Sequence, residues 1–311
     1  MSAVVFAYHN VGVRCLRVLL DAAVDVRLVV THADNPTETI WFASVAEVAA
    51  EHGLRCLTPA DPNGAEVLAQ VRATEPDFLF SFYYRQMISA PLLGVPRRGA
   101  FNMHGSLLPK FRGRAPVNWA VLQGERETGA TLHVMDVKPD HGAIVDQCAV
   151  PILGDDSARE VFDKVTLAAE IVLARTLPRL IEGTASFTPQ VHQMGQYFGG
   201  RRPEDGRIPP LAGAKQIHDL VRAVAPPDYP GAFFDSRGRR VLVARTLRVA
   251  SAAAPPIART RFTMSASDNA LGITAADGTR LRILAASIDG QPCDAARFNA
   301  VFGADGASPD T

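Results

Sequence analysis

Short apolar segments alternate with segments of helical periodicity along the first half of the 311-residue chain. Val4–Ala7, Val26–Thr31 and Phe78–Phe82 have the length and composition of buried strands, and Val13–Ala23 has apolar residues at helical spacing. This alternation favours parallel strands, because each intervening helix returns the chain to the edge of the sheet where the previous strand began. We therefore expect an α/β fold with a doubly wound, mostly parallel, Rossmann-like sheet and helices on both faces.

Further elements continue this order up to about the middle of the chain. A helix is predicted over Ser44–His52, and a long amphipathic helix over Ala158–Gly183 follows three capping candidates, Asp155, Asp156 and Ser157. The remaining strands predicted in this half are Ala100–His104, Thr128–Met135 and Ala143–Pro151, the last two joined by the polar loop Asp136–Gly142.

A polar stretch rich in glycine and proline, GGRRPEDGRIPP over Gly199–Pro210, has the composition of a linker. After a predicted helix over Lys215–Ala225, short alternating β segments indicate a small barrel or sandwich. These segments are Ala232–Asp235, Arg240–Val249, Ala270–Thr274 and Arg280–Ile288. We place an N-terminal domain at residues 1–200, a linker at 201–210, a small β domain at 211–305 and a frayed tail at 306–311.

Charge and composition bear on the class of partner and on the compartment. Lys and Arg number 32, as do Asp and Glu, and this zero net charge argues against a broad nucleic-acid surface. No apolar run reaches the roughly 18 residues of a membrane span, and the first residues lack the basic region of a signal peptide. The four cysteines form no CxxC pair, which favours reduced thiols. We expect a cytoplasmic protein without membrane insertion, nucleic-acid partner or metal.

Two polar side chains lie at the end of one predicted strand. Asn102 and His104 are separated by one residue, so both project from the same face of the sheet. They lie at the carboxyl end of the strand, where ligands of open α/β sheets bind, and Gly105 and Pro109 turn the chain there. Taken alone, an Asn-x-His pair is also compatible with turn chemistry and a hydrogen-bonded structural histidine.

Asn102, His104 and Asp140 together suit the attack of an amine on an activated carbonyl. An imidazole exchanges protons near neutral pH, an amide N–H can stabilise an oxygen that becomes negative, and a carboxylate can orient the imidazole. Asp140 would arrive from the loop Asp136–Gly142. Its position between a proline and a glycine is equally typical of a plain turn residue.

Two further groups are candidates for binding an anionic substrate. His9, Asn10 and Gly12 follow the first strand and open a helix, where backbone N–H groups can hold an anion; a plain helix entry is the alternative. Arg201 and Arg202 either grip a phosphate or keep the linker in solvent.

The block around these residues resembles a known family. The segment NMHGSLLPKFRGRAPVNWA is similar to the H-x-SLLP-x-x-RG signature of the folate-dependent formyltransferases, and ETGATLHVMD-x-x-x-D-x-G resembles their second motif. The resemblance implies catalytic roles for Asn102, His104 and Asp140 in transferring a formyl group from 10-formyltetrahydrofolate to an amine.

The resemblance extends over nearly the whole chain. FAYHNVG, THADNP, FSFYYRQMI, FGGRRPED and YPGAFF resemble the formyltransferase domain of the bifunctional enzyme that acts on UDP-4-amino-4-deoxy-L-arabinose. This implies that the acceptor is the amine of a sugar nucleotide, in a pathway of lipid A modification and polymyxin resistance. The alternatives are methionyl-tRNA, which would call for a more basic surface, and another amino sugar nucleotide.

The same resemblance implies a folate pocket and a C-terminal OB-like domain. The pocket residues are Gln86, Met87, Ile88, Arg114, Asp136, Val137, Lys138, Pro139 and Asp140. Two features depart from the bifunctional relative: the chain ends near residue 311 without a second catalytic domain, so another protein would supply any oxidative step, and PEDGRIPP replaces the usual continuation after Arg202. The remaining alternatives are a non-catalytic folate- or nucleotide-binding module and a deformylase that passes the formyl group to water.

Overall fold

The computed structural model describes residues 1–36, 38–191, 194–249, 261–267 and 270–310. The chain forms two compact units. The first comprises Met1–Val117, Glu127–Pro151 and Phe162–Gly199, and the second comprises Asn118–Arg126, Ile152–Val161 and Gly200–Thr311. The second unit therefore includes two segments from the first half of the chain besides the whole C-terminal part.

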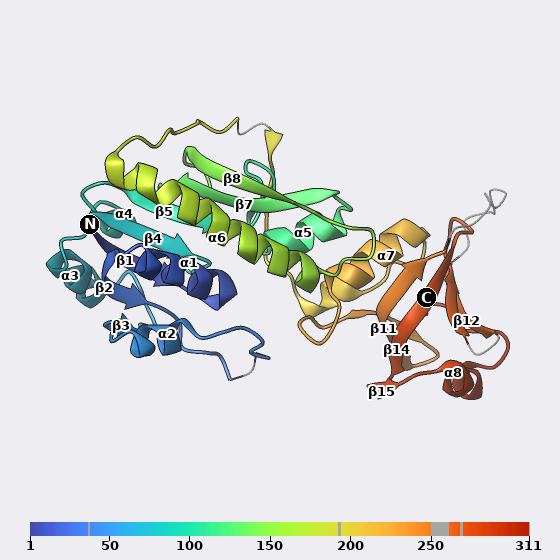
Figure 1. Ribbon diagram of the computed structural model, residues 1–311. Coiled ribbons are helices and arrows are strands. Elements are labelled where there is room, and N and C mark those ends of the chain that lie inside the picture. The colour runs from blue at the N-terminus through green and yellow to red at the C-terminus, as the bar shows by residue number, and fades with distance from the viewer. Residues whose placement is uncertain (37, 192–193, 250–260, 268–269, 311) are drawn as a thin grey trace. The chain divides into compact units, whose positions relative to one another are not determined.

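The first unit is built on a seven-stranded sheet (Figure 1). Its strand order is β3 (Cys56–Leu57), β2 (Asp25–Val30), β1 (Ser2–Ala7), β4 (Phe78–Phe82), β5 (Ala100–His104), β7 (Glu127–Val134) and β8 (Ile144–Pro151). The strands from β3 to β5 are parallel, β7 runs antiparallel to β5, and β8 runs antiparallel to β7. The order reverses between β1 and β4, which creates the switch point expected of a doubly wound sheet.

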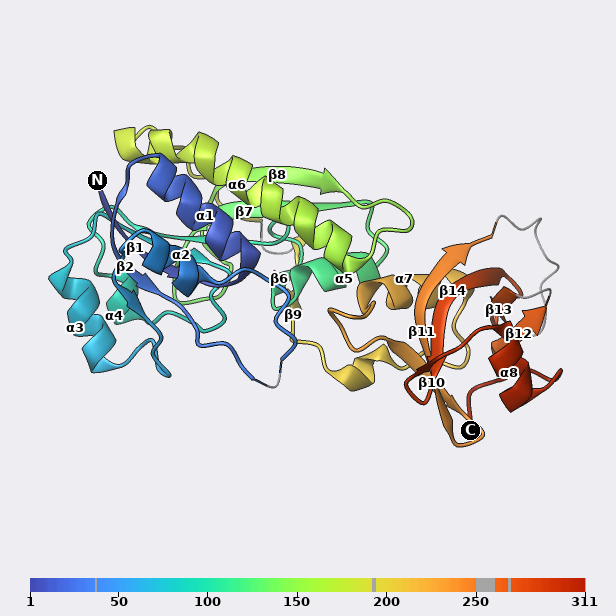
Figure 2. The same cartoon turned by 60° about the horizontal axis from the view of Figure 1, so that its bottom comes forward.

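Helices cover both faces of this sheet. On one face α1 (His9–Asp21) lies beside α6 (Ala158–Glu182), as both views show (Figures 1 and 2). On the other face α3 (Ala65–Ala73) and α4 (Ala90–Leu93) pack against alternate strand residues such as Phe6. The other helices of this half are α2 (Val45–Glu51) and α5 (Pro116–Leu122). The predicted fold class is confirmed.

Helix boundaries follow from local hydrogen bonds that periodicity does not reveal. Helix α1 begins at His9, four residues before its predicted start, because the N–H of Gly12 already donates to the carbonyl of Tyr8 (3.1 Å). Helix α6 begins after Ser157, whose hydroxyl accepts from the N–H of Glu160 while the Glu160 carboxylate accepts from the N–H of Ser157. This reciprocal capping box identifies Ser157 as the cap among the three candidates.

The second unit contains a short 3₁₀ turn (Pro203–Gly206), helix α7 (Ala214–Ala223) and an antiparallel sheet that curls in Figure 2. The sheet order is β10 (Ala232–Ser236), β11 (Arg239–Arg248), β14 (Arg280–Ile288), β13 (Ala270–Thr274) and β12 (Thr263–Ser267), with β15 (Gln291–Pro292) paired to β14. Helix α8 (Ala295–Phe302) completes the unit. The small C-terminal β domain is thus confirmed as a β-rich fold.

The expected fraying of the tail is wrong for residues 306–310. Ala307 is fully buried and bridges Met264, and the Asp310 carboxylate accepts from the N–H of Arg237 (2.8 Å). Strand β12 gives the tail a pairing partner, so these residues are held rather than free. Thr311 lies outside the described residues.

Two further observations concern the chain as a whole. All four cysteines are free, with Cys15 and Cys293 buried. Among the residues that the structure describes, no helix is long and apolar enough to cross a membrane, and no group of three or more His, Cys, Asp or Glu side chains could hold a metal ion.

Candidate active site

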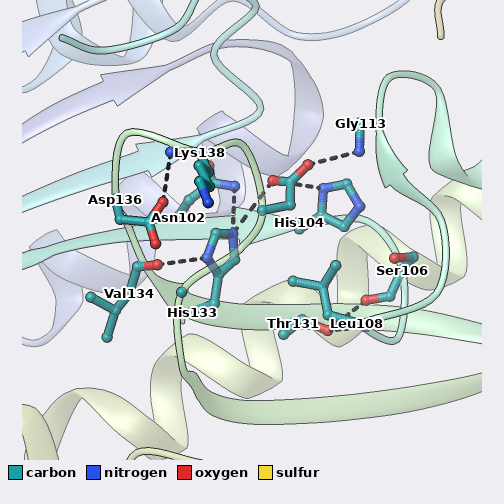
Figure 3. A network of polar contacts seen from close by, with 12 residues as sticks. Asn102, His104, Ser106, Leu108, Gly113, Thr131, His133, Val134, Asp136 and Lys138 are labelled. Atoms are coloured by element: carbon teal, nitrogen blue, oxygen red, sulfur yellow. Dashed lines mark hydrogen bonds and ion pairs between the residues drawn. The ribbon is translucent and has the colours of Figure 1, made fainter. Parts of the chain in front are cut away.

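The carboxyl end of β5 presents Asn102 and His104 on the same side of the sheet, as their spacing predicts (Figure 3). His104 is 6% exposed, whereas Asn102 is partly exposed. The chain then turns at Gly105, where a Cβ atom would lie 1.7 Å from the hydroxyl oxygen of Tyr83. A side chain at position 105 would therefore have to displace the Tyr83 ring, for which glycine leaves room.

The His104 ring lies between two hydrogen-bond acceptors. Its Nδ1 is 3.4 Å from Oδ1 of Asp140, and its Nε2 is 2.8 Å from the carbonyl oxygen of Phe111. A carbonyl and a carboxylate both accept, so the ring satisfies the two contacts together when both nitrogens carry a hydrogen. The arrangement places a ring nitrogen of His104 beside the largely buried Asp140 carboxylate.

Asp140 is brought to His104 by the loop between β7 and β8. Its backbone has φ +53°, and the Gln190 side-chain amide donates to the carbonyl oxygens of Asp140 (3.0 Å) and Gly142 (2.7 Å). Its Oδ2 accepts from the N–H of Gly113 (2.8 Å). Burial raises the pKa of Asp140, but its polar neighbours, His104 first among them, outweigh burial and hold that pKa well below its usual range.

His133 is a fourth polar side chain at this site and was not predicted from the sequence. It lies in β7 directly opposite Asn102, with its Nε2 3.1 Å from Nδ2 of Asn102 and 3.5 Å from Oδ1 of Asp140. Its Nδ1 is 2.8 Å from the carbonyl oxygen of Val134 (Figure 3). The available signal was a histidine inside a predicted apolar strand, but only the antiparallel register of β5 and β7 reveals its partner.

The residues predicted to bind folate lie on three segments, which follow β4, β6 (Arg112–Gly113) and β7. Gln86 and Met87 follow β4 and are exposed, whereas the side chain of Ile88 is buried in the core, so only its backbone could reach a ligand. The loop after β7 exposes Asp136, Val137 and Lys138, with Pro139 half-buried; Arg114 is exposed near β6 and β9 (Tyr197–Phe198).

The residues predicted to bind the acceptor are divided between the two units. In the first, the His9 ring stacks on Phe42 with centroids 4.0 Å apart, and Asn10 Oδ1 accepts from the N–H of Ala43. Gly12 does not offer its N–H, which is bonded to Tyr8; its missing side chain instead permits close packing, because a Cβ would lie 3.1 Å from Val45.

Arg201 and Arg202 belong to the second unit. The guanidinium of Arg201 lies over the Trp119 ring, 5.0 Å from its centroid, and donates to the carbonyl oxygen of Asp205. The N–H of Arg202 donates to the Asp205 carboxylate (2.7 Å). Burial lowers the pKa of Arg201.

Solved structures of sugar formyltransferases have the same fold. The N-formyltransferase from Helicobacter canadensis, in complex with folinic acid and dTDP-3-aminofucose, matches with a TM-score of 0.70 at 18% identity, covering 94% of this chain and 99% of that one. A sugar 3-N-formyltransferase solved with dTDP and 5-N-formyl-tetrahydrofolate matches with a TM-score of 0.72 at 18% identity, over 94% and 98% of the two chains. HypX from Aquifex aeolicus matches at 0.62 and 17%, over 100% of this chain and 49% of its own.

Family comparison covers both halves of the chain. Residues 13–177 match the formyl transferase family, and residues 201–303 match the formyl transferase C-terminal domain. The first match contains Asn102, His104, His133 and Asp140. The chain belongs to the formyl transferase family.

Proposed function

We propose that this enzyme transfers a formyl group from 10-formyltetrahydrofolate to the amine of a sugar nucleotide. The observation that carries the proposal is the convergence of Asn102, His104 and Asp140 at the carboxyl edge of the sheet, with the buried Asp140 carboxylate 3.4 Å from Nδ1 of His104. Acyl transfer to an amine needs a proton acceptor, a donor for the oxygen that becomes negative and a group that supports the charged acceptor. These three side chains supply one of each.

Each residue has a step that follows from its contacts. His104 accepts at Nε2 the proton that the attacking amine loses and returns it to the leaving nitrogen, while Asp140 supports the charged ring at Nδ1. Asn102 donates an N–H to the formyl oxygen as it becomes negative. In the structure Nε2 contacts the Phe111 carbonyl, which requires a hydrogen on Nε2, so the proposed role requires this contact to break when an amine binds.

The loops around the site fit a folate donor. The side chains of Met87 and Val137 are 53% and 66% exposed, and a flat aromatic ring system would cover such apolar groups. Gln86 and Lys138 are exposed on the same two loops and are the proposed polar contacts to the folate. When bound, the folate supplies the activated formyl group; the chain orients it next to His104.

The acceptor is assigned from the sequence and from the similar structures. The resemblance over FAYHNVG, THADNP and FGGRRPED makes UDP-4-amino-4-deoxy-L-arabinose the first candidate, and the Helicobacter canadensis structure with dTDP-3-aminofucose supports nucleotide-linked amino sugars as a class. His9, Asn10, Arg201 and Arg202 are the proposed contacts to the acceptor, and a cytoplasmic location fits such a substrate.

Turnover assays with 10-formyltetrahydrofolate and a panel of UDP-, dTDP- and GDP-linked amino sugars test this function. His104→Ala and Asp140→Asn are expected to lower kcat by about 10²-fold or more, because general acid–base catalysis contributes 10²–10⁴-fold. The exposed His52 provides a control, since His52→Asn changes the same residue type outside the site and should leave kcat unchanged. Near-native rates in both active-site variants would overturn the assigned roles.

Three other outcomes would redirect the proposal. Formylation of methionyl-tRNA with a steep salt dependence would identify a nucleic-acid acceptor. Release of formate in the absence of any amine would identify a deformylase. Tight folate binding without turnover on any acceptor would identify a binding module.

A further inference from the structure

We propose that His133 is a positioning residue that orients the Asn102 amide for formyl transfer. The proposal rests on the function proposed above. His133 lies in β7, one strand in from the edge of the sheet, is 2% exposed and pairs with Asn102 across the β5–β7 pair. Its Nε2 is 3.1 Å from Nδ2 of Asn102 (Figure 3). This contact restrains the amide that would donate to the formyl oxygen.

The contacts of His133 define which of its nitrogens carries the hydrogen. Nδ1 faces the carbonyl oxygen of Val134 at 2.8 Å, and a carbonyl can only accept, so Nδ1 carries the hydrogen. In the neutral ring Nε2 then has a free lone pair, which accepts from the amide of Asn102. The same lone pair excludes the reversed amide, because the Asn102 oxygen would meet a second acceptor.

The planar geometry of an amide turns this contact into a directional constraint. The Asn102 nitrogen carries two hydrogens in one plane, about 120° apart, and His133 engages one of them. The other is fixed in direction as soon as the first is held. His133 is buried and Asn102 is partly exposed, so the proposal places the second hydrogen on the side of the amide away from His133. A preorganised donor avoids reorientation during the reaction.

Both histidines lie near the same carboxylate oxygen of Asp140. Oδ1 of Asp140 is 3.4 Å from Nδ1 of His104 and 3.5 Å from Nε2 of His133. A hydrogen on Nε2 of His133 would face the Asn102 amide donor, so the contact with Asn102 requires Nε2 as an acceptor.

The test uses His133→Leu, which removes the acceptor, and His133→Gln, whose side-chain oxygen can replace Nε2. For His133→Leu we expect kcat to fall about 10- to 100-fold with KM values within about twofold, since losing an oxyanion donor outright costs about 10²–10³-fold. His133→Gln should keep kcat within about fivefold of the native value. Melting temperatures of both variants verify that they are folded.

A double-mutant cycle with Asn102→Ala tests whether His133 acts on the reaction through the Asn102 amide. Because His133 acts through Asn102, adding His133→Leu to Asn102→Ala should cause less than about a twofold further loss. A His133→Leu variant with native kcat, or losses that multiply in the double variant, would overturn the proposal.

A readout independent of turnover separates this proposal from the proposed function. Nitrogen-15 NMR of the protein alone should show His133 in the Nδ1–H form and Asn102 side-chain amide protons protected from exchange, with protection lost in His133→Leu. An Nε2–H form, or unchanged protection, contradicts the positioning role. If the NMR result holds but no amine is formylated, the proposed function fails and the structural assignment stands.

Discussion

Asp140 is the residue on which most of the site's contacts converge, and its titration is open to measurement. Its pKa is held below the usual range, so the ionised carboxylate stabilises the folded state. For a depressed pKa, this stabilisation is complete above the unfolded-state value of about 3.9 and is lost as the pH falls through the folded-state value.

We therefore predict that the stability difference between the native protein and Asp140→Asn is retained from pH 7 to pH 5 and shrinks from pH 4 downward. Urea midpoints at pH 7, 5, 4 and 3 measure it. Asp21→Asn, at an exposed aspartate on α1, is the matched control. A difference that grows steadily below pH 4 would contradict the assigned direction.

Single residues show where sequence reasoning succeeds and where it stops. The spacing of Asn102 and His104 was sufficient to place both on one face, because strands alternate with a period of two. The contact of Asp140 with His104 agrees with the pairing expected from the family motif. His133 could not be assigned in the same way, since its partner depends on the register between two strands, which no single-strand pattern contains.

At the scale of elements, the side chain of Gln190 anchors the loop between β7 and β8. Gln190 donates to the carbonyl oxygens of Asp140 and Gly142, and thereby fixes the loop that carries the carboxylate. The segment that contains Gln190 follows α6 and pairs with β8 through Thr188. A distant stretch of chain therefore determines where Asp140 lies.

Gln190→Leu removes both hydrogen bonds and is predicted to lower kcat about 10-fold, because displacements of about 1 Å from a catalytic geometry can cost up to 10²-fold. Gln190→Glu, similar in size but without the donor, should show at least the same loss. Steady-state kinetics measures both effects, with Gln216→Leu on the exposed face of α7 as the control. Native kcat in both Gln190 variants would show that these two hydrogen bonds are not needed for catalysis.

Most strands of the central sheet and the longest helix were predicted, whereas several other elements were missed. Strands β1, β2, β4, β5, β7 and β8 and helix α6 were predicted within a few residues. Helices α3, α5 and α8 and strand β12 were missed. Length alone does not separate the two groups, since α2 has 7 residues and was predicted, whereas α3 has 9 and was missed. Contacts made elsewhere in the fold decide such cases. The held tail belongs to the same class, because its order comes from pairing with β12.

At the scale of the whole molecule, the second unit draws on the first half of the chain. The Asn118 side chain donates to the carbonyl of Ala223 (2.6 Å), and Arg222 donates to the carbonyls of Val121 and Asp156. His218 bonds the carbonyl oxygen of Gly154 (2.8 Å). A break at residue 200 would leave these carbonyls and the amide without their partners.

We predict that a fragment of residues 1–200 melts at least about 5 °C below the full chain, since each lost hydrogen bond contributes about 1 kcal/mol and each kcal/mol shifts the midpoint by about 2–4 °C at this size. Differential scanning calorimetry of the two proteins measures the shift. An unchanged midpoint would show that residues 118–126 and 152–161 do not need the C-terminal part.

The antiparallel strand β7 has a consequence for how the enzyme responds to its ligands. Strands β5 and β7 each have a neighbour on both sides, so Asn102 and His133 lie on backbone that is paired on both sides, and His104 lies on backbone that is paired with β7. Of the four side chains, Asp140 alone is mounted on a loop. A conformational response to a bound ligand would therefore move the Asp140 carboxylate more readily than the three side chains that lie on strands.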